Sequence, residues 1–444
     1  MLVSSPSPSP VPVPDDPLTA LMEGRYLDPE TGEPTGVNTR SLVIADTLAG
    51  SEGEFVRGLG FGKRLAVVSD TTTHQVLGAR IEAALHRHFT IESIVLPREP
   101  AADGETVENI RAASAQADAL IAVGSGTIND LTKYASARDG KPYAVFATAP
   151  SMNGYTSLTA SITQHGHKLT LPAQAPAGAF FDLVILAAAP KRMIRAGLGD
   201  SVCRTTAQTD WLLSHLLLGT SYRQLPFSLL EGDEPLLLDM AQDLVLGSLE
   251  AMRVLTRTLV LSGFGTAIVG SSAPASQAEH LVSHYLDMLG PVDRPSVFHG
   301  EQVGVTTLSV ARLQQAMLET RPLLVPDTVS EAEIMARFGD ELGRSIWPEF
   351  AAKRLDAKRA DELNHQIATR WTEMSSRLAK SHISAERLEA VLTAAGAPTT
   401  PEAIHLTRRF YEEALVHGRE IRNRYSVLDV MAASGRLELL SHTI

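Results

Sequence analysis

Short, nearly unbroken apolar runs alternate with helix-periodic segments in the first part of the chain. Four runs have the length and continuous apolar character of parallel strands covered on both faces: 64–69 (RLAVVS), 91–96 (IESIVL), 119–123 (ALIAV) and 143–147 (YAVFA). Helical periodicity follows the first run over 73–88 and precedes the third over 106–117. This alternation predicts a parallel, doubly wound α/β sheet.

The pattern changes after about residue 190, where strand-like runs nearly vanish. Long segments with helical periodicity take their place: 193–218, 236–262, 276–289, 304–318, 331–338, 360–380, 385–394 and 401–424. We therefore expect an α/β domain over residues 17–190 and an all-α domain over 191–444. Residues 1–16 (MLVSSPSPSPVPVPDD) lack the basic start and apolar stretch of a signal peptide, and they predict a disordered, polyproline-like tail.

Composition narrows the class of protein. The chain has 444 residues, and 39 Lys and Arg against 51 Asp and Glu give a net charge of −12, which argues against nucleic-acid or membrane-surface partners. No stretch approaches the roughly 18–20 uninterrupted apolar residues of a membrane span. Cys203 is the single cysteine, so an internal disulfide is excluded, and we expect a buried packing residue in a reducing compartment. These features predict a cytoplasmic globular enzyme or binding protein.

A glycine-rich turn follows the run at 119–123. Gly124, Ser125, Gly126 and Thr127 lead into a helical segment, and such a turn lets backbone N–H groups approach a pyrophosphate. It lies at the carboxyl end of a predicted strand, where open α/β sheets bind ligands. The alternative is a tight turn in which Asn129 or Asp130 caps the helix.

Asp70 ends the run at 64–69 in the same way. An acid at this place accepts hydrogen bonds from ribose hydroxyls and favours NAD over NADP. The alternative is again a cap, here for the helix predicted from Thr73.

Two histidines spaced by four residues, His280 and His284, share one face of a predicted helix, and His299 follows. Glu279 precedes the first histidine, so this is not the zinc-protease pattern HExxH. Asp200 lies in a glycine-rich segment that we expect to be a helix entry. Two histidines and one carboxylate with an open position are a common catalytic metal set. The alternatives are an ordinary surface or core histidine pair and an aspartate that caps its helix.

Several motifs, in one order, make the chain resemble the glycerol-1-phosphate dehydrogenases, closest to the bacterial arabinose-operon type. The motifs are 124–133 (GSGTINDLTK), 149–157 (APSMNGYTS), 196–200 (AGLGD), Asp210-Trp211, 274–284 (PASQAEHLVSH) and 299–303 (HGEQV). The wider superfamily holds iron-containing alcohol dehydrogenases, glycerol dehydrogenases and 3-dehydroquinate synthases. The resemblance, over roughly residues 40–435, implies a dehydroquinate synthase-like fold: an α/β NAD-binding domain over 17–190, a helical catalytic domain over 191–444 and an active site between them.

The resemblance also implies cofactors and roles. The cofactors are NAD(H), with NADP as an alternative, and one divalent ion, zinc or nickel with iron as a further option. Asp200, His280 and His299 are the implied metal ligands, and Arg204 stands where iron-type relatives often carry a fourth. His284 is implied as a proton relay, and Lys168 as a group near the reacting centre or the substrate phosphate. The implied nucleotide contacts are Asp70, Gly124, Ser125, Gly126, Thr127, Asp130, Thr148 and Ser151.

Three departures from the family pattern lie beside these residues. Relatives usually read SMDGY where this chain has Asn153, and SRPASG where it has Ala273 and Gln277. Losing an arginine removes a bidentate anion contact, and replacing an aspartate changes charge and hydrogen-bond polarity. Weaker candidates for a cationic substrate contact are Arg419, Arg422 and Arg424, for which the alternative is a solvated or inter-subunit helix face.

The expected reaction is reversible, metal-dependent reduction of dihydroxyacetone phosphate to sn-glycerol 1-phosphate with NAD(H). Another phosphorylated or polyhydroxylated carbonyl substrate is the first alternative. A dehydroquinate synthase-like lyase or cyclase and a non-catalytic nucleotide-binding regulator are the further ones. Because relatives form dimers or larger assemblies, we expect a homo-oligomer.

Overall fold

The structure is a computed structural model that describes residues 16–164 and 167–444. The predicted disordered tail lies outside the described residues except for Asp16. The Asp16 carboxylate accepts a hydrogen bond from the backbone N–H of Thr19 at 3.2 Å and so caps the first helix, α1 (Pro17–Met22).

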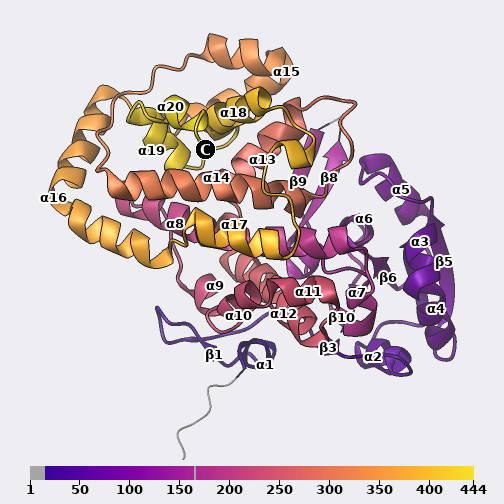
Figure 1. Cartoon of the computed structure of the whole chain (residues 1–444). Coiled ribbons are helices and arrows are strands. Elements are labelled where there is room, and N and C mark those ends of the chain that lie inside the picture. Colours follow the sequence, from indigo (N-terminus) through magenta and orange to yellow (C-terminus); the bar gives the residue numbers. More distant parts are fainter. Residues whose placement is uncertain (1–15, 165–166) are drawn as a thin grey trace, which may run out of the picture.

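A six-stranded, all-parallel sheet forms the centre of the N-terminal half (Figure 1). In spatial order its strands are β3 (Ser41–Ala45), β10 (Gly178–Asp182), β7 (Tyr143–Ala147), β6 (Ala119–Gly124), β4 (Arg64–Asp70) and β5 (Thr90–Leu96). The four strands predicted from the apolar runs are β4 to β7, so the predicted sheet is confirmed. The pattern did not predict β3 and β10, which complete the sheet beside β7.

Helices cover both faces of the sheet, which explains the continuous apolar runs. Leu65 and Val67 of β4 pack in one cluster with α2 and α4, whereas Ala66 and Val68 face the other way, toward α5 and α6. The helices of this half are α1, α2 (Glu52–Gly58), α3 (Thr71–Thr73), α4 (Ala79–Leu85), α5 (Gly104–Ala113), α6 (Gly126–Arg138) and α7 (Leu183–Ala187). A π-helical turn, η1 (His74–Gly78), joins α3 to α4, and η2 (Gly154–Thr156) is a 3₁₀ turn.

Two small antiparallel pairs lie outside the main sheet, β1 (Tyr26–Leu27) with β2 (Pro34–Thr35) and β8 (Thr159–Gln164) with β9 (His167–Pro172). The β8–β9 hairpin falls in a segment where no strand was predicted. It joins the loop after β7 to β10.

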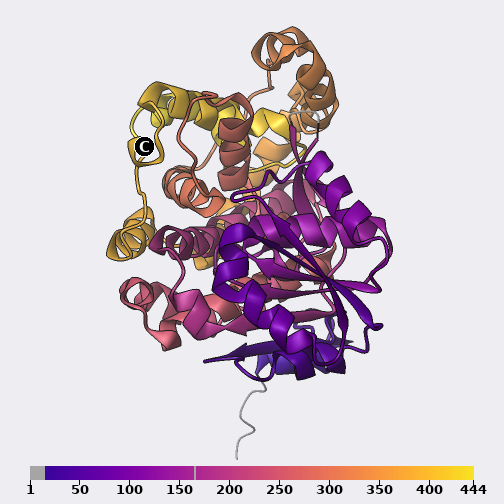
Figure 2. The ribbon, with the colours of Figure 1, turned by 90° about the vertical axis from the view of Figure 1, so that its right-hand side faces the viewer.

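Every element from Lys191 onward is helical, as the loss of strand-like runs predicts. The helices are α8 (Lys191–Leu218), α9 (Leu225–Ser228), α10 (Asp233–Asp239), α11 (Ala241–Leu246), α12 (Leu249–Val269), α13 (Ala278–Leu289), α14 (His299–Glu319), α15 (Glu331–Ala351), α16 (Ala357–Ser381), α17 (Ala385–Ala394), α18 (Arg408–His417), α19 (Val427–Ala433) and α20 (Leu437–Ser441), with 3₁₀ turns η3 (Ala273–Ala275), η4 (Glu402–Ile404) and η5 (Gly418–Ile421). In Figures 1 and 2 this region, coloured from magenta (α8) through orange to yellow, lies beside the mainly indigo and purple sheet region.

Two of the predicted helices are wrong as single elements. The segment 236–262 is divided among α10, α11 and α12: Met240 separates α10 from α11, and Gly247, with φ of 87°, ends α11. The segment 401–424 is likewise divided into η4, α18 and η5. Helix α12 is long and apolar enough, by length and composition alone, to cross a membrane, but 61% of its most apolar window is buried inside the protein. We therefore interpret α12 as a core helix.

The order of the strands reverses between β4 and β6. The chain passes from β4 to β5 on one side and then returns to place β6, β7 and β10 on the other. In a doubly wound sheet this reversal opens a crevice at the carboxyl ends of the two strands. Asp70 ends β4 and Gly124 ends β6, so the two sequence-predicted nucleotide contacts lie on either side of the reversal.

Candidate active site and metal centre

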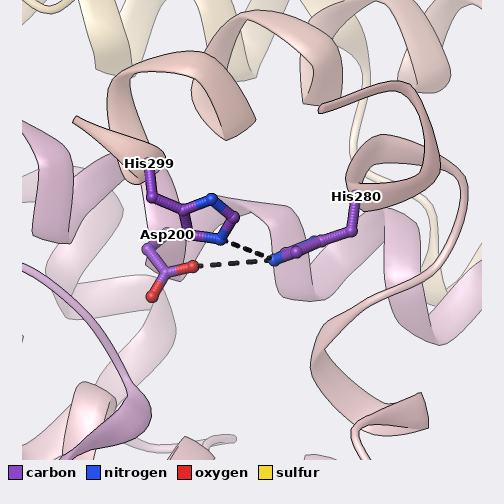
Figure 3. A group of neighbouring side chains, drawn as sticks. All are labelled: Asp200, His280 and His299. Carbon is purple, nitrogen blue, oxygen red and sulfur yellow. Dashed lines mark hydrogen bonds and ion pairs between the residues drawn. The ribbon is translucent and has the colours of Figure 1, made fainter. Parts of the chain in front are cut away.

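Asp200, His280 and His299 converge from α8, α13 and the first residue of α14 (Figure 3). One ligand atom from each lies within 4.8 Å of the others. Nε2 of His280 is 3.3 Å from Nε2 of His299 and 3.9 Å from Oδ1 of Asp200. Ligand atoms on a tetrahedral zinc ion with bonds of about 2.0–2.1 Å are about 3.3–3.4 Å apart. The donor set therefore fits a divalent ion after a small inward adjustment of Asp200.

Asp200 lies in the middle of α8, so the predicted helix entry is wrong. The glycines before it serve close packing instead. A Cβ atom at Gly199 would lie 2.0 Å from the carbonyl oxygen of Gly300, and a Cβ at Gly300 would lie 1.8 Å from that of Ala196. Because neither position has a side chain, α8 touches the beginning of α14 and brings His299 beside Asp200.

A second glycine contact joins α8 to the sheet region. A Cβ at Gly197 would lie 1.7 Å from the carbonyl oxygen of Pro150, in the loop that follows β7. In that loop the backbone N–H of Asn153 donates a hydrogen bond to Oδ2 of Asp200 at 2.8 Å. The other oxygen, Oδ1, faces His280. Burial raises the pKa of Asp200, and the charge of His280 and the Asn153 N–H act against that rise.

Glu279 orients His280, a role that the sequence did not reveal. Its Oε1 lies 3.0 Å from Nδ1 of His280 and accepts the backbone N–H of Gln277 at 2.7 Å. Thr206 donates its hydroxyl to Oε2 at 3.2 Å. When Nδ1–H of His280 donates to this carboxylate, Nε2 is unprotonated and its lone pair points toward Asp200 and His299, as a metal ligand requires. The signal was an acid directly before a ligand histidine.

His284 lies next to this group on the same face of α13, as its spacing predicts. Its ring centroid is 6.0 Å from that of His280 and 6.2 Å from that of His299. The side chain is half-buried. This places a titratable group beside the three converging residues without making it one of them.

Arg204 and Cys203 are not part of the group of candidate metal ligands, Asp200, His280 and His299, which we call the metal group. The Arg204 guanidinium pairs with Glu234 of α10 (Nε to Oε1, 2.5 Å), so it is engaged away from Asp200, His280 and His299, and the three-ligand site stays a prediction. Cys203 is fully buried, and burial raises the pKa of its thiol well above its ordinary value. Cys203, Glu279 and His280 form a second buried group that overlaps the first at His280.

The glycine-rich turn begins α6 as predicted. A Cβ at Gly124 would lie 2.5 Å from Cβ of Ile128, so the turn admits no side chain there. Ser125 is the N-cap residue but makes no side-chain capping bond, which leaves the first N–H groups of α6 without that partner. Gly126 and Thr127 are the first residues of the helix. Their arrangement at the reversal of strand order fits a pyrophosphate.

The acids predicted beside this turn have structural roles. Oδ1 of Asp70 accepts the backbone N–H groups of Thr72 (2.7 Å) and Thr73 (2.9 Å), so the capping interpretation is confirmed and the ribose contact stays a prediction for Oδ2. Oδ2 of Asp130 accepts the N–H of Ser161 at 2.9 Å, and Oδ1 accepts the Asn129 amide at 3.1 Å. Asp130 therefore ties α6 to β8, and its contact with the nucleotide stays a prediction.

The remaining nucleotide candidates follow β7, next to β6. The N–H of Thr148 donates to the carbonyl of Gly124 at 3.1 Å, and Ser151 is half-buried in the same loop. Sequence reasoning did not assign a role to Lys133 of α6. Its buried ammonium group donates to the carbonyls of Gly154 (2.5 Å) and Thr159 (3.1 Å), and so holds the loop that carries Asn153. Burial lowers the pKa of Lys133 to about 8.

The candidate substrate residues are spread more widely. Lys168 lies in β9 opposite Thr163, but its side chain lies outside the described residues. The Asn153 amide reaches Oγ of Ser262 at 3.4 Å. Arg419 is a buried partner of Asp327 (2.7 Å), so we interpret it as structural. Gln277 is buried, and its amide donates to the carbonyl of Ala273 at 2.9 Å.

Comparison with known proteins gives one consistent result. Residues 43–190 match the family model described as iron-containing alcohol dehydrogenase. The chain is 33% identical over 274 residues to glycerol-1-phosphate dehydrogenase [NAD(P)+] of Pyrococcus furiosus, covering 62% of this chain and 78% of that protein. It is 28% identical over 389 residues to the Bacillus licheniformis protein of the same name, covering 86% of both.

Solved structures show the same fold at low sequence identity. A probable glycerol dehydrogenase from Sinorhizobium meliloti aligns with a TM-score of 0.59 at 17% identity, over 89% of this chain and 96% of that one. NADH-dependent butanol dehydrogenase A from Thermotoga maritima aligns with a TM-score of 0.60 at 14% identity, over 91% and 97%. The chain therefore belongs to the glycerol-1-phosphate dehydrogenase family, an NAD(P)-dependent branch of the iron-containing alcohol dehydrogenases.

Proposed function

We propose that this protein reduces dihydroxyacetone phosphate to sn-glycerol 1-phosphate, reversibly, with NADH and one divalent metal ion. The observation that carries the proposal is the convergence of Asp200, His280 and His299. The hydrogen bond from Asn153 ties this group to the loop after β7, on the side of the sheet where NAD(H) is expected. The similar proteins of Pyrococcus furiosus and Bacillus licheniformis are named glycerol-1-phosphate dehydrogenase, which supports this substrate.

The candidate metal ligands, the glycine-rich turn and His284 each have a separate role in the proposed reaction. Asp200, His280 and His299 would hold the ion, which in its bound state supplies a Lewis acid that polarises the ketone oxygen. The turn at 124–127 would hold the pyrophosphate and so direct C4 of the nicotinamide toward the carbonyl carbon. A hydride adds to that carbon with its electron pair, and the oxygen takes a proton from His284 or from a water that His284 orients. NADH, a proton and the ketone thus become NAD⁺ and the alcohol.

Two finer features belong to the same proposal. Asp70 would prefer NAD(H) over NADP(H), because a second carboxylate oxygen at the end of β4 repels a 2′-phosphate. Two histidines and one carboxylate suit zinc, nickel or iron alike. We also propose a cytoplasmic enzyme, since its cysteine, Cys203, is a free thiol. The expected homo-oligomer stays a prediction that light scattering would test.

Oxidation of NADH by metal-loaded protein, with dihydroxyacetone phosphate beside dihydroxyacetone, tests the proposal. We expect fast oxidation with the phosphorylated ketone only, and sn-glycerol 1-phosphate as the product on a chiral assay. Asp200→Asn should abolish the reaction. Asp239→Asn, which changes an exposed aspartate of α10 in the same way, should leave it unchanged.

The second candidate function is the same reaction on a different carbonyl substrate. The position of Asn153 supports this alternative. Its backbone N–H binds Asp200, and its side chain is a neutral amide where relatives usually carry a carboxylate. If neither ketone is reduced while NADH and metal both bind, the proposed substrate is wrong. Other phosphorylated or polyhydroxylated carbonyl compounds then take its place.

A further inference from the structure

Arg424 places a guanidinium group on the segment that leads into α13. Its Nη1 donates to Oγ of Ser276 at 2.8 Å and also contacts the Ser276 carbonyl, and its Nη2 donates to Oγ of Ser272 at 2.6 Å. These serines flank η3, where Ala273 offers no polar side chain. A residue 148 positions later in the chain thus supplies a cation to this segment.

The segment is continuous with the metal group. Gln277 follows Ser276, and its N–H binds the same oxygen of Glu279 that faces Nδ1 of His280. The charge of Glu279 is also close enough to Arg424 to oppose part of the lowering of the Arg424 pKa by burial. The Arg424 guanidinium therefore lies beside the candidate active site.

Arg422 lies next to Arg424, and the charge of Glu349 is close enough to oppose the effect of burial on the pKa of Arg422. Within the described residues, its half-buried guanidinium makes no hydrogen bond or ion pair. Burial lowers the pKa of Arg422, and burial together with the charge of Arg422 lowers the pKa of Arg424 to about 10. Arg424 is bound to serine oxygens and makes no ion pair with any carboxylate of residues 16–164 and 167–444. Two adjacent guanidinium groups in a partly buried place carry a positive charge that an anion would stabilise.

We propose that Arg422 and Arg424 form the subsite for the phosphate group of the substrate. This inference rests on the proposed function and names the residues that select a phosphorylated ketone. Guanidinium groups bind phosphate oxygens in a bidentate fork, and Arg422 has all of its N–H donors available. The serine contacts fix Arg424 in place, so little side-chain entropy is lost on binding.

Kinetics of Arg422→Gln give the sharpest test. Because Arg422 makes no hydrogen bond or ion pair in the described chain, the variant should fold normally. We expect KM for dihydroxyacetone phosphate to rise about 10–100-fold, which is the effect of losing a charged hydrogen bond. The inhibition constant of inorganic phosphate should rise by the same factor, while the slow turnover of unphosphorylated dihydroxyacetone stays unchanged. Arg321→Gln removes an exposed, unpaired arginine of the described chain and is the matched control.

Arg424→Lys is the second variant, since lysine keeps the charge but loses the fork. It should also raise KM for the phosphorylated ketone. If wild-type enzyme is active and both variants keep its KM, the subsite is wrong although the proposed function stands. If wild-type protein is inactive with dihydroxyacetone phosphate, the readout becomes thermal stabilisation by inorganic phosphate. Stabilisation that Arg422→Gln abolishes supports the subsite, and equal or absent stabilisation in both proteins overturns it.

Discussion

The backbone N–H of Asn153 donates to Oδ2 of Asp200 across 2.8 Å, and this bond joins the loop after β7 to the middle of α8. The contact uses the main chain, so the bond does not depend on the Asn153 side chain. Gly197 makes the approach possible, because a side chain there would overlap Pro150. The candidate metal ligand is thus held by both halves of the protein.

Two substitutions of Asn153 separate the role of its backbone N–H from the role of its side chain. Asn153→Ala keeps the N–H and should keep the metal, whereas Asn153→Pro removes the donor at a φ of −84° that proline tolerates. We expect the proline variant to bind metal about 10–100-fold more weakly, as losses of outer-sphere partners do. Metal retained against a graded chelator measures the difference. Equal retention by the two variants would contradict the role of this hydrogen bond.

Removing His280 should release the metal without unfolding the protein. His280→Ala deletes the ligand atom that lies between Asp200 and His299, so metal content and turnover should both vanish. His284→Ala is the control, because that residue lies beside the group rather than in it. It should keep the metal and lose mainly turnover. Elemental analysis combined with circular dichroism checks both variants, and a fully loaded His280→Ala protein would defeat the assignment.

Cofactor preference tests Asp70. Serine caps a helix about as well as aspartate does, so Asp70→Ser should keep α3 in place while removing the charge. We expect the ratio of kcat/KM for NADPH to that for NADH to rise at least about tenfold, equivalent to roughly 1.4 kcal/mol of relieved repulsion. An unaltered ratio, with melting temperature unchanged, would show that Asp70 is a cap alone.

Gly199 is expected to tolerate no side chain. Gly199→Ala places a Cβ against the carbonyl of Gly300, so α14 and His299 must move away from Asp200. We expect a loss of roughly 1–3 kcal/mol in the free energy of unfolding, together with weaker metal binding. Gly58→Ala adds the same methyl group to α2, where nothing lies within 4 Å, and should cost nothing. Denaturant titration of both variants gives the comparison.

Asp210 should make stability depend on pH. Its buried carboxylate accepts the N–H groups of Ala278 (3.3 Å) and Val427 (3.1 Å), at the beginnings of α13 and α19. Burial, and next the charge of Glu279, raise its pKa to about 8. In the folded protein Asp210 therefore keeps a proton that it releases at about pH 3.9 in the unfolded chain. As pH rises from about 4 to 8, this group lowers the free energy of unfolding. Asp210→Asn should flatten that decline in denaturant titrations, and an identical slope would contradict the shift.

The sequence predicted the parts of the fold whose patterns are local. The apolar runs of β4, β6 and β7 are buried on both faces, so each run was visible by itself. The edge strand β5 was predicted from its run although most of it is exposed, whereas the edge strand β3, half-buried along its length, gave no such signal. The helix predicted at 331–338 ends at Gly339, whose φ of 76° breaks α15. The helix predicted at 236–262 failed in part because Gly247, in the left-handed region, ends α11.

The candidate site also contains residues that the sequence could predict and residues whose roles only the folded chain shows. The convergence of Asp200, His280 and His299 could be predicted because their residue types and spacings are unusual. Glu279 had a signal in its place directly before His280, whereas the role of Lys133 depends on which groups burial brings to it. Arg424 contacts a segment that lies far away in the sequence, so only the folded chain shows this contact. Asp70 was predicted with two roles: local geometry confirms the cap, and the ribose contact stays a prediction.

The double anchoring of Asp200 has a thermodynamic consequence. Asp200, His280 and His299 all belong to the helical half, whereas the Asn153 loop belongs to the sheet half, so the Asn153–Asp200 hydrogen bond is the link through which an ion in this group would act on the sheet half. If the ion changes the affinity for NAD(H) through this link, NAD(H) must change the affinity for the ion by the same factor. Metal and nucleotide would then be mutual effectors without touching each other.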